Sequence, residues 1–218
     1  MKGGAMKKDF LISEAIRYGW VTMKANFWFF VGVLIIAWLV VGVPSGIASA
    51  LVKQSAGLAF LFRIIGWAAN IIISIGVITI ALKFLNNEKP RLEDLFSFQP
   101  FFWHYLLAAI LVGLIVTAGF LLLAVPGIYW AIKYQFFGYL VVDRKLKPME
   151  ALKQSAKITA NVKWKLLGFG LILACINILG VMCLIIGVFA TIPTTLLAFA
   201  YAYRKLLSQT EIAQPPQT

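Results

Sequence analysis

The sequence has few of the side chains from which most active sites are built. Its 218 residues contain one histidine, His104, two cysteines and only eight acidic residues. The acidic residues all lie outside the long apolar runs. Proton-coupled transporters typically carry acids or histidines within the membrane. Catalytic triads and metal centres need several such groups together. We therefore expect a protein that is not an enzyme and binds no metal or cofactor.

The two cysteines do not suit a disulfide. Cys175 and Cys183 lie in one apolar run, and at 1.5 Å per residue their Cα atoms would be about 12 Å apart in a helix. The Cα atoms of a disulfide lie within about 7 Å of each other. We expect both to be packing residues. The sequence also contains no phosphate loop and no dinucleotide-binding fingerprint.

Charge is scarce for a protein of this length. Charged residues make up 13% of the chain and hydrophobic residues 61%, whereas soluble domains have about 25% and about 45–50%. Several continuous apolar runs approach or exceed the roughly 18–20 residues that a helix needs to cross a bilayer. Helices satisfy their own backbone groups in lipid, and the alternation typical of a membrane β-barrel is absent. The sequence predicts an all-α polytopic membrane bundle.

We predict six transmembrane helices in a single domain that covers residues 1–208, with a disordered polar tail at 209–218. We place the turns of the second and third helix pairs at Gly119 and Gly187. Ala48-Ser49-Ala50 is typical of a signal-peptidase site, but the apolar run before it begins only at Phe27, too late for a signal peptide. The predicted spans are approximately 27–50, 64–85, 101–118, 121–142, 164–185 and 188–203.

Basic residues mark alternate ends of these spans. Five Lys or Arg precede the first span and seven follow the fourth, whereas none separates the third from the fourth or the fifth from the sixth. The positive-inside rule then places both termini in the cytoplasm. The formal net charge of +12 therefore indicates anionic lipid headgroups as a partner, and no nucleic acid.

Short motifs recur along the chain. Ser13-Glu14-Ala15-Ile16-Arg17 resembles Met149-Glu150-Ala151-Leu152-Lys153, and Trp28 matches Trp164 at the same offset of 136. A weaker copy surrounds Leu92-Glu93-Asp94-Leu95 and Trp103. We predict three repeated hairpins, at about 9–85, 90–142 and 148–206, each preceded by a short amphipathic interfacial helix. Apolar segments also align by chance, so a twofold repeat stays open.

The short helices suit a position at the membrane surface. The helix that begins at Pro148 has lysines at helical spacing, and such a helix can lie among anionic headgroups. The alternative is a helix packed on the bundle. Trp28, Trp103 and Trp164 are the expected interface anchors, because tryptophan is enriched at that level of the membrane.

Lys133 is the unusual charge within a span. It takes the same repeat position as Lys83, and both lysines could extend toward the headgroups. Alternatively they contact an anionic lipid or another anionic ligand, because intramembrane charges are often functional. Asn70 and Asn177 are the further candidates, either as lining of a polar pathway or as interhelical hydrogen-bond partners. We expect no acidic residue at the depth of these lysines, because all eight lie outside the predicted spans.

A resemblance is carried by Val125-Pro126-Gly127-Ile128, by the segments 139–143 and 148–155, and by Trp164. Residues 100–206 resemble a broad family of uncharacterised bacterial integral-membrane proteins. They are similar to the membrane domain that precedes the catalytic domain of some glycerophosphodiester phosphodiesterases. The resemblance implies a multi-pass protein of the bacterial cytoplasmic membrane. It implies no diesterase activity, because these residues have no counterpart of the soluble catalytic domain.

Two functions follow as expectations. The first is a non-enzymatic scaffold or accessory factor in envelope or lipid homeostasis. The alternative is a transporter or lipid-handling protein for an anionic lipid or small molecule. The small-residue face of Gly42, Gly46 and Ala50 allows close helix approach, so a second copy of the chain or another membrane protein is also open as a partner.

Overall fold

The computed structural model describes residues 9–183 and 186–212, which form nine α-helices and one 3-10 helix, with no strand. This confirms the predicted all-α class. In chain order the elements are α1 (Ile12–Ala25), α2 (Phe27–Leu51), α3 (Ala56–Leu85), η1 (Leu92–Phe96), α4 (Phe102–Leu122), α5 (Ala124–Tyr134), α6 (Phe137–Arg144), α7 (Pro148–Ile158), α8 (Lys163–Met182) and α9 (Ile186–Ile212).

Four helices in the described part of the chain are long and apolar enough to cross a membrane, namely α2, α3, α4 and α8. Helices α2, α4 and α8 follow the first, third and fifth predicted spans closely. Helix α3 begins at Ala56, eight residues before the predicted start at residue 64. The reason is local, because the Ser55 side chain caps α3 by accepting a hydrogen bond from the Leu58 backbone nitrogen.

The two glycines predicted to lie at turns lie within helices. The chain turns at Leu123 rather than at Gly119, and Gly187 belongs to α9. Both glycines mark close helix contacts instead. A Cβ atom at Gly119 would approach the Gly127 Cα atom to 2.8 Å, and one at Gly187 would approach the Gly180 carbonyl oxygen to 2.3 Å. Small residues permit this separation between helices.

The fourth predicted span is not one helix. Helix α5 ends before Gln135 and α6 begins after Phe136, and the backbone leaves helical geometry at Phe136. A hydroxyl from α7 supplies hydrogen bonds to the backbone at this break. Ser155 Oγ donates to the Lys133 carbonyl oxygen at 3.0 Å and accepts from the Phe136 nitrogen at 3.3 Å. Thr159 Oγ1 also donates to the Lys133 oxygen, at 3.2 Å. Both hydroxyl residues are buried.

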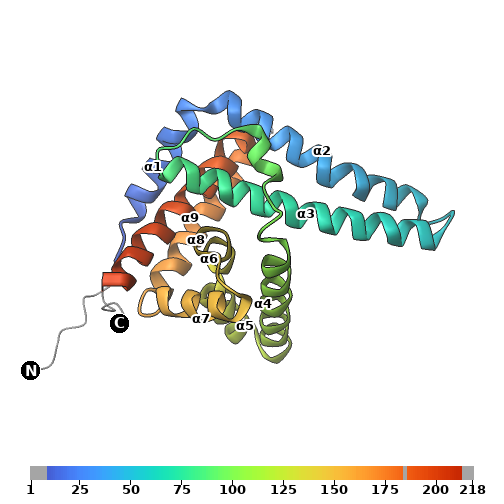
Figure 1. Cartoon of the computed structure of the whole chain (residues 1–218). Helices are drawn as coiled ribbons and strands as arrows, with labels where there is room; N and C mark the ends of the chain where they lie inside the picture. The colour runs from blue at the N-terminus through green and yellow to red at the C-terminus, as the bar shows by residue number, and fades with distance from the viewer. Residues whose placement is uncertain (1–8, 184–185, 213–218) are drawn as a thin grey trace, which may run out of the picture.

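The helices pair as three hairpins, α2 with α3, α4 with α5, and α8 with α9. Figure 1 shows the hairpin of α2 and α3 extending away from the other helices as an arm, while α4 and α5 point in another direction. The apolar core lies where α3, α6 and α9 meet. There the Tyr139 ring stacks on that of Tyr203 at a centroid distance of 5.2 Å, and Phe136 packs against Tyr203 at 5.9 Å.

Each short surface element packs on the hairpin that precedes it. Element η1 lies on α3, and α7 lies on α5 and α6. Helix α1, which has no preceding hairpin, packs on α9 instead. The contacts are close, because a Cβ atom at Gly76 of α3 would approach the Leu95 oxygen of η1 to 2.2 Å, and one at Gly19 of α1 would approach the Thr194 oxygen of α9 to 2.3 Å. The reading of these elements as packed on the bundle therefore holds for all three.

The first four residues of the predicted polar tail are helical. Helix α9 continues to Ile212, so residues 209–212 are helical, and residues 213–218 lie outside the described part. The Gln209 side chain holds the N-terminal segment, since its oxygen accepts from the Asp9 nitrogen at 2.8 Å and its nitrogen donates to the Asp9 oxygen at 2.6 Å.

The break between α5 and α6 gives a stability prediction. Replacing Ser155→Ala leaves the Phe136 nitrogen without its buried partner, so we expect the free energy of unfolding to fall by about 1–3 kcal/mol. The measurement is denaturant unfolding in detergent micelles. Ser208→Ala is the matched control, because the Ser208 hydroxyl also donates to a backbone oxygen, that of Lys205 in its own helix, but is exposed. We expect it to change stability by less than about 0.5 kcal/mol. Equal effects of the two variants would contradict the account.

Candidate functional site

Lys83 forms an ion pair that sequence reasoning missed. Its ammonium lies 2.6 Å from Asp94 Oδ1, because η1 folds back onto the end of α3. The expectation that no acid lies near these lysines is therefore wrong for Lys83. Burial alone would raise the pKa of the Asp94 carboxyl, but hydrogen bonds from the Arg91 backbone nitrogen and from Lys83, together with their positive charges, hold that pKa below its usual value.

The two predicted asparagines lie in different surroundings. Asn70 is exposed on α3. Asn177 of α8 donates to the Leu173 oxygen of the same helix at 2.8 Å and to Thr195 Oγ1 of α9 at 2.7 Å. The bond to Thr195 is an interhelical hydrogen bond, which is the alternative role predicted for Asn177. Neither residue lines any of the cavities described below. The predicted set of Lys133, Asn70 and Asn177 is therefore not brought together.

Lys133 lies in the last turn of α5. Its ammonium is 5.1 Å from the centroid of the Tyr134 ring, a distance that suits a cation–π contact. Within the described residues no carboxylate lies at ion-pair distance from it. Lys133 stands one helical turn after Tyr129 on the same helix, and it therefore shares a face with that tyrosine.

The three predicted anchor tryptophans occupy one structural position. Trp28, Trp103 and Trp164 are each the second residue of a helix, in α2, α4 and α8. Their side chains are 82%, 69% and 85% exposed. Large exposed aromatic rings at corresponding helix starts are what an interfacial belt requires. Their depth in a bilayer stays a prediction.

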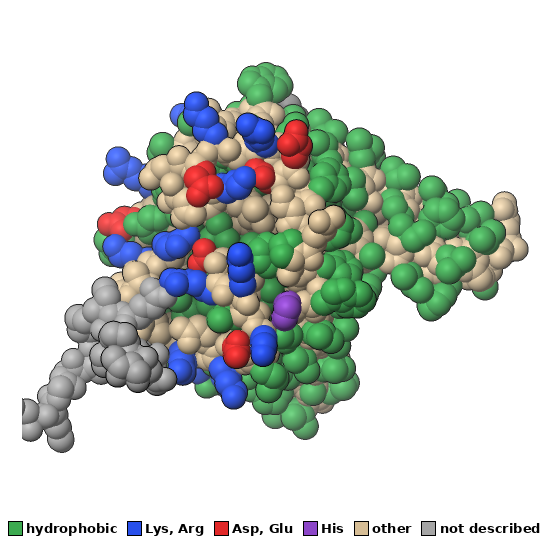
Figure 2. All heavy atoms as spheres, in the orientation of Figure 1, with side chains coloured by type: hydrophobic (Ala, Val, Ile, Leu, Met, Phe, Trp, Pro, Cys, Tyr) green, Lys and Arg blue, Asp and Glu red, His purple; other side chains and the backbone are tan. Residues whose placement is uncertain are grey.

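Charged side chains gather on one face of the molecule. In Figure 2 the blue and red groups lie over the body formed by the short elements and helix ends, whereas the arm of α2 and α3 is green and tan on the face shown. The exposed cations of the arm are Lys53 and Arg63. A cavity of about 510 Å³ opens on this charged face between α6, α7 and α9. Its polar and apolar lining includes Arg144, Glu150, Lys153, Gln154, Lys157 and Leu207.

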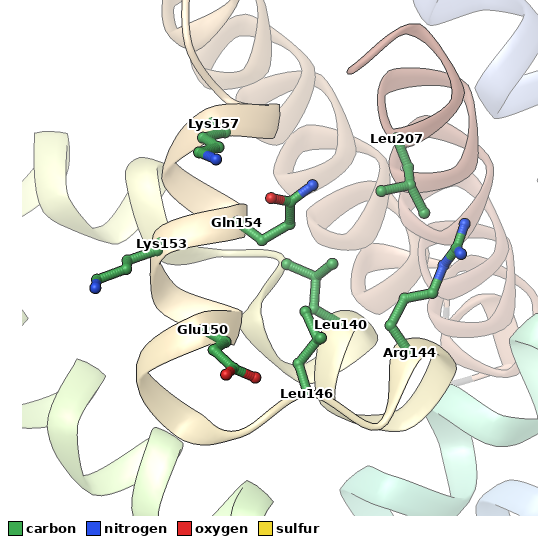
Figure 3. A pocket seen from close by; sticks show the side chains of 8 residues that line it. All are labelled: Leu140, Arg144, Leu146, Glu150, Lys153, Gln154, Lys157 and Leu207. Atoms are coloured by element: carbon green, nitrogen blue, oxygen red, sulfur yellow. The ribbon is translucent and has the colours of Figure 1, made fainter. Parts of the chain in front are cut away.

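The cavity on the charged face has mixed charge. Figure 3 shows Arg144 and Leu207 on one side and Gln154 on the other, while Lys153 points away from the opening. Glu150 supplies a carboxylate among the three cationic residues of the lining. That carboxylate, together with the ion pair of Arg144 with Asp143, offsets part of the positive potential of the lining.

A second, apolar groove lies between α5 and the start of α8. Its volume is about 240 Å³. Lys163 stands at its edge, where the ammonium lies over the Tyr129 ring, 3.9 Å from the centroid, and donates to the Tyr129 hydroxyl. Sequence reasoning missed both residues, because nothing in their local patterns indicates that α5 and α8 meet. The groove is lined by Val125, Ile128, Tyr129, Ile132, Lys163, Trp164 and Leu167.

Among residues 9–183 and 186–212, no three His, Cys, Asp or Glu side chains lie together in a way that could hold a metal ion. The comparisons with known proteins are also negative: no protein-family model, no curated protein and no solved structure matches the chain. Function must therefore be argued from the geometry.

The pair of Lys83 and Asp94 can be tested by a double-mutant cycle. We expect Lys83→Met and Asp94→Asn to show a coupling of about 1 kcal/mol at pH 7. The folded-state pKa of Asp94 is depressed, so its stabilisation is present above the unfolded pKa of about 3.9. It is lost as the pH falls through the lower folded pKa. Denaturant unfolding of the four proteins of the cycle in micelles, from pH 7 down to pH 2, measures both the coupling free energy and its loss at low pH.

The control for this cycle is Glu88→Gln, which removes an exposed acid from the segment between α3 and η1. We expect it to show no coupling to Lys83→Met. A coupling that stays constant down to pH 2, or that Glu88 shares equally, would exclude the ion pair as its source.

Proposed function

We propose that the chain is a multi-pass protein of the bacterial cytoplasmic membrane that acts without catalysis, as a scaffold or accessory factor in envelope or lipid homeostasis. The observation that carries the proposal is the separation of its surfaces. Charged groups gather on one face, and the hairpins extend from it with exposed apolar sides (Figure 2). A protein built in this way can rest its charged face at the headgroups and present several apolar hairpins to neighbours.

Six spans in three repeats are part of this proposal. The starts of α1 and α7, at Ile12 and Pro148, are 136 residues apart, and so are the starts of α2 and α8, at Phe27 and Lys163. This spacing equals the offset of the sequence motifs and supports the first and third units. The middle unit differs, since η1 replaces a surface helix and its returning segment is divided into α5 and α6.

The arrangement favours a scaffold over a transporter. Only 11% of the apolar windows of α2 and α4 is buried within the chain, so most of their side chains are free to contact lipid or another helix. The asparagine expected to line a pathway in α8, Asn177, instead has hydrogen-bond partners within the bundle. Apolar surface of this extent marks membrane or protein interaction.

The proposed topology predicts which positions are accessible from each side. We replace Cys175 and Cys183 with alanine and introduce either Gln54→Cys, in the α2–α3 turn, or Lys153→Cys, on α7; both positions are exposed. A membrane-impermeant maleimide added to spheroplasts should label only the cysteine at position 54, because positive-inside orientation places α7 in the cytoplasm. Labelling of both positions before lysis would reject the proposed orientation.

The scaffold reading predicts that the protein does not conduct solutes or lipids. Purified protein in vesicles of phosphatidylcholine and phosphatidylglycerol should release an entrapped anionic dye no faster than protein-free vesicles do. It should likewise not speed the exchange of labelled phosphatidylglycerol between leaflets. A dye efflux or lipid exchange at least threefold above that control would favour the transporter or lipid-handling alternative. Vesicles with Lys133→Ala protein then show whether that lysine takes part.

A further inference from the structure

We propose that the groove between α5 and α8 holds one anionic phospholipid. Its phosphate is bound by Lys163, and one acyl chain follows the groove toward the membrane interior. This inference rests on the proposed membrane position of the chain and deepens it, because it names a ligand and a site. The residues that carry it are Lys163 and Tyr129, with Ile128 in the floor of the groove.

The groove suits a hydrocarbon chain. Apart from Tyr129 and Lys163, its lining consists of aliphatic side chains and Trp164. The α5 wall extends from Val125 to Ile132, which at 1.5 Å per residue gives about 10 Å of length along the helix. Ile132 lies near the end of α5 that faces α7, and Val125 lies at the opposite end. The groove therefore leads from the charged end of the hairpin into its apolar part.

A cation is fixed at the mouth of the groove. Lys163 is the first residue of α8, and its ammonium is held by the ring and the hydroxyl of Tyr129. An ammonium has three donor hydrogens, so the tyrosine leaves donors for a phosphate oxygen. Lys133, one turn after Tyr129, adds a second positive charge on the α5 side.

Neither cation is neutralised within the described residues. No carboxylate there lies at ion-pair distance from Lys163 or Lys133, whereas the nearby Lys165 pairs with Asp9. Two unpaired cations beside an apolar groove match the charge distribution of an anionic phospholipid. A soluble anion would leave the groove unfilled. The cavity on the charged face is a poorer candidate for an acyl chain, because five of its eight lining residues are charged or polar.

Selectivity should come from the headgroup rather than from the acyl chain. Lipid tails are as apolar as the groove lining, so an acyl chain leaves one apolar environment for another when it binds. Charge-assisted hydrogen bonds to phosphate are the strong contacts. A zwitterionic lipid brings its own cation close to Lys163 and Lys133, which weakens its binding relative to an anionic lipid.

The test is native mass spectrometry of protein released from nanodiscs that contain equal amounts of phosphatidylglycerol and phosphatidylcholine. Wild type should retain one phosphatidylglycerol in preference to phosphatidylcholine. Lys163→Gln should reduce the retained phosphatidylglycerol at least fivefold, and Lys163→Arg should restore it. Ile128→Trp, which fills the groove without changing charge, should also reduce it at least fivefold. Lys153→Gln is the control, since it removes an exposed lysine that lies elsewhere, and should retain the wild-type amount.

Several outcomes would overturn the site. One is a wild type that retains no phosphatidylglycerol or retains both lipids equally. Another is a loss in Lys163→Gln without a loss in Ile128→Trp, because the lipid then lies outside the groove. A third is an equal loss in Lys153→Gln. Circular dichroism melting in the same nanodiscs establishes that each variant is folded before its lipid is measured.

Failure of this inference is distinguishable from failure of the proposed function. If cysteine labelling supports the topology while Lys163→Gln retains the lipid, only the lipid site is wrong. If labelling rejects the topology, Lys163 does not lie at the cytoplasmic headgroups, and the proposed function and the lipid site fail together.

Discussion

Backbone hydrogen bonding in an apolar environment is the constraint on which the arrangement of this chain depends. A backbone group without a partner is expensive in lipid, so a helix can be interrupted only where another part of the protein supplies the missing bonds. At the break between α5 and α6, those bonds come from Ser155 of α7 and from Thr159, the residue that caps its C-terminal end. Because α7 leads directly into α8, seating α7 on α5 also places the start of α8 beside α5. The contact of Lys163 with Tyr129 is a consequence of that seating.

Packing of the surface elements also joins the three hairpins to one another. Each surface element lies on the preceding hairpin, and α1 closes the series by packing on α9. The ends of α3, α6 and α9 then converge. Asp143 of α6 accepts hydrogen bonds from Tyr203 at 2.8 Å and from Arg204 at 3.5 Å, and Arg204 also donates to the Asn86 side chain at 2.9 Å. Repeat proteins usually form open arrays in which units contact only their neighbours. Here the first surface helix contacts the last hairpin, so the three hairpins extend from one joined centre.

The local parts of this fold could be read from the sequence, and the long-range parts could not. Continuous apolar runs located α2, α4 and α8, because length and hydropathy are properties of single segments. The break near Gln135 was missed because the surrounding residues are as apolar and aromatic as those of an unbroken span. Gly119 was read as a turn because glycine also suits turns, whereas its role is close contact with Gly127. The pairing of Lys83 with Asp94, and of Lys163 with Tyr129, depends on which elements fold together.

Charged side chains determine selectivity in the proposed membrane setting, because apolar side chains cannot distinguish lipid from another helix. Every apolar side chain on the arm finds an equivalent environment in lipid or against another helix, so the apolar surface fixes depth without selecting a ligand. In the proposed lipid site, selection is left to the polar groups at the start of α8, where an ammonium beside an apolar groove would decide which headgroup binds. The partner of Lys83 is built into the chain as Asp94, whereas Lys133, at the corresponding repeat position, has no carboxylate within ion-pair distance in the described residues. Under the proposed repeat, one position carries a lysine fixed by an internal acid in the first unit and a lysine available to an external anion in the second.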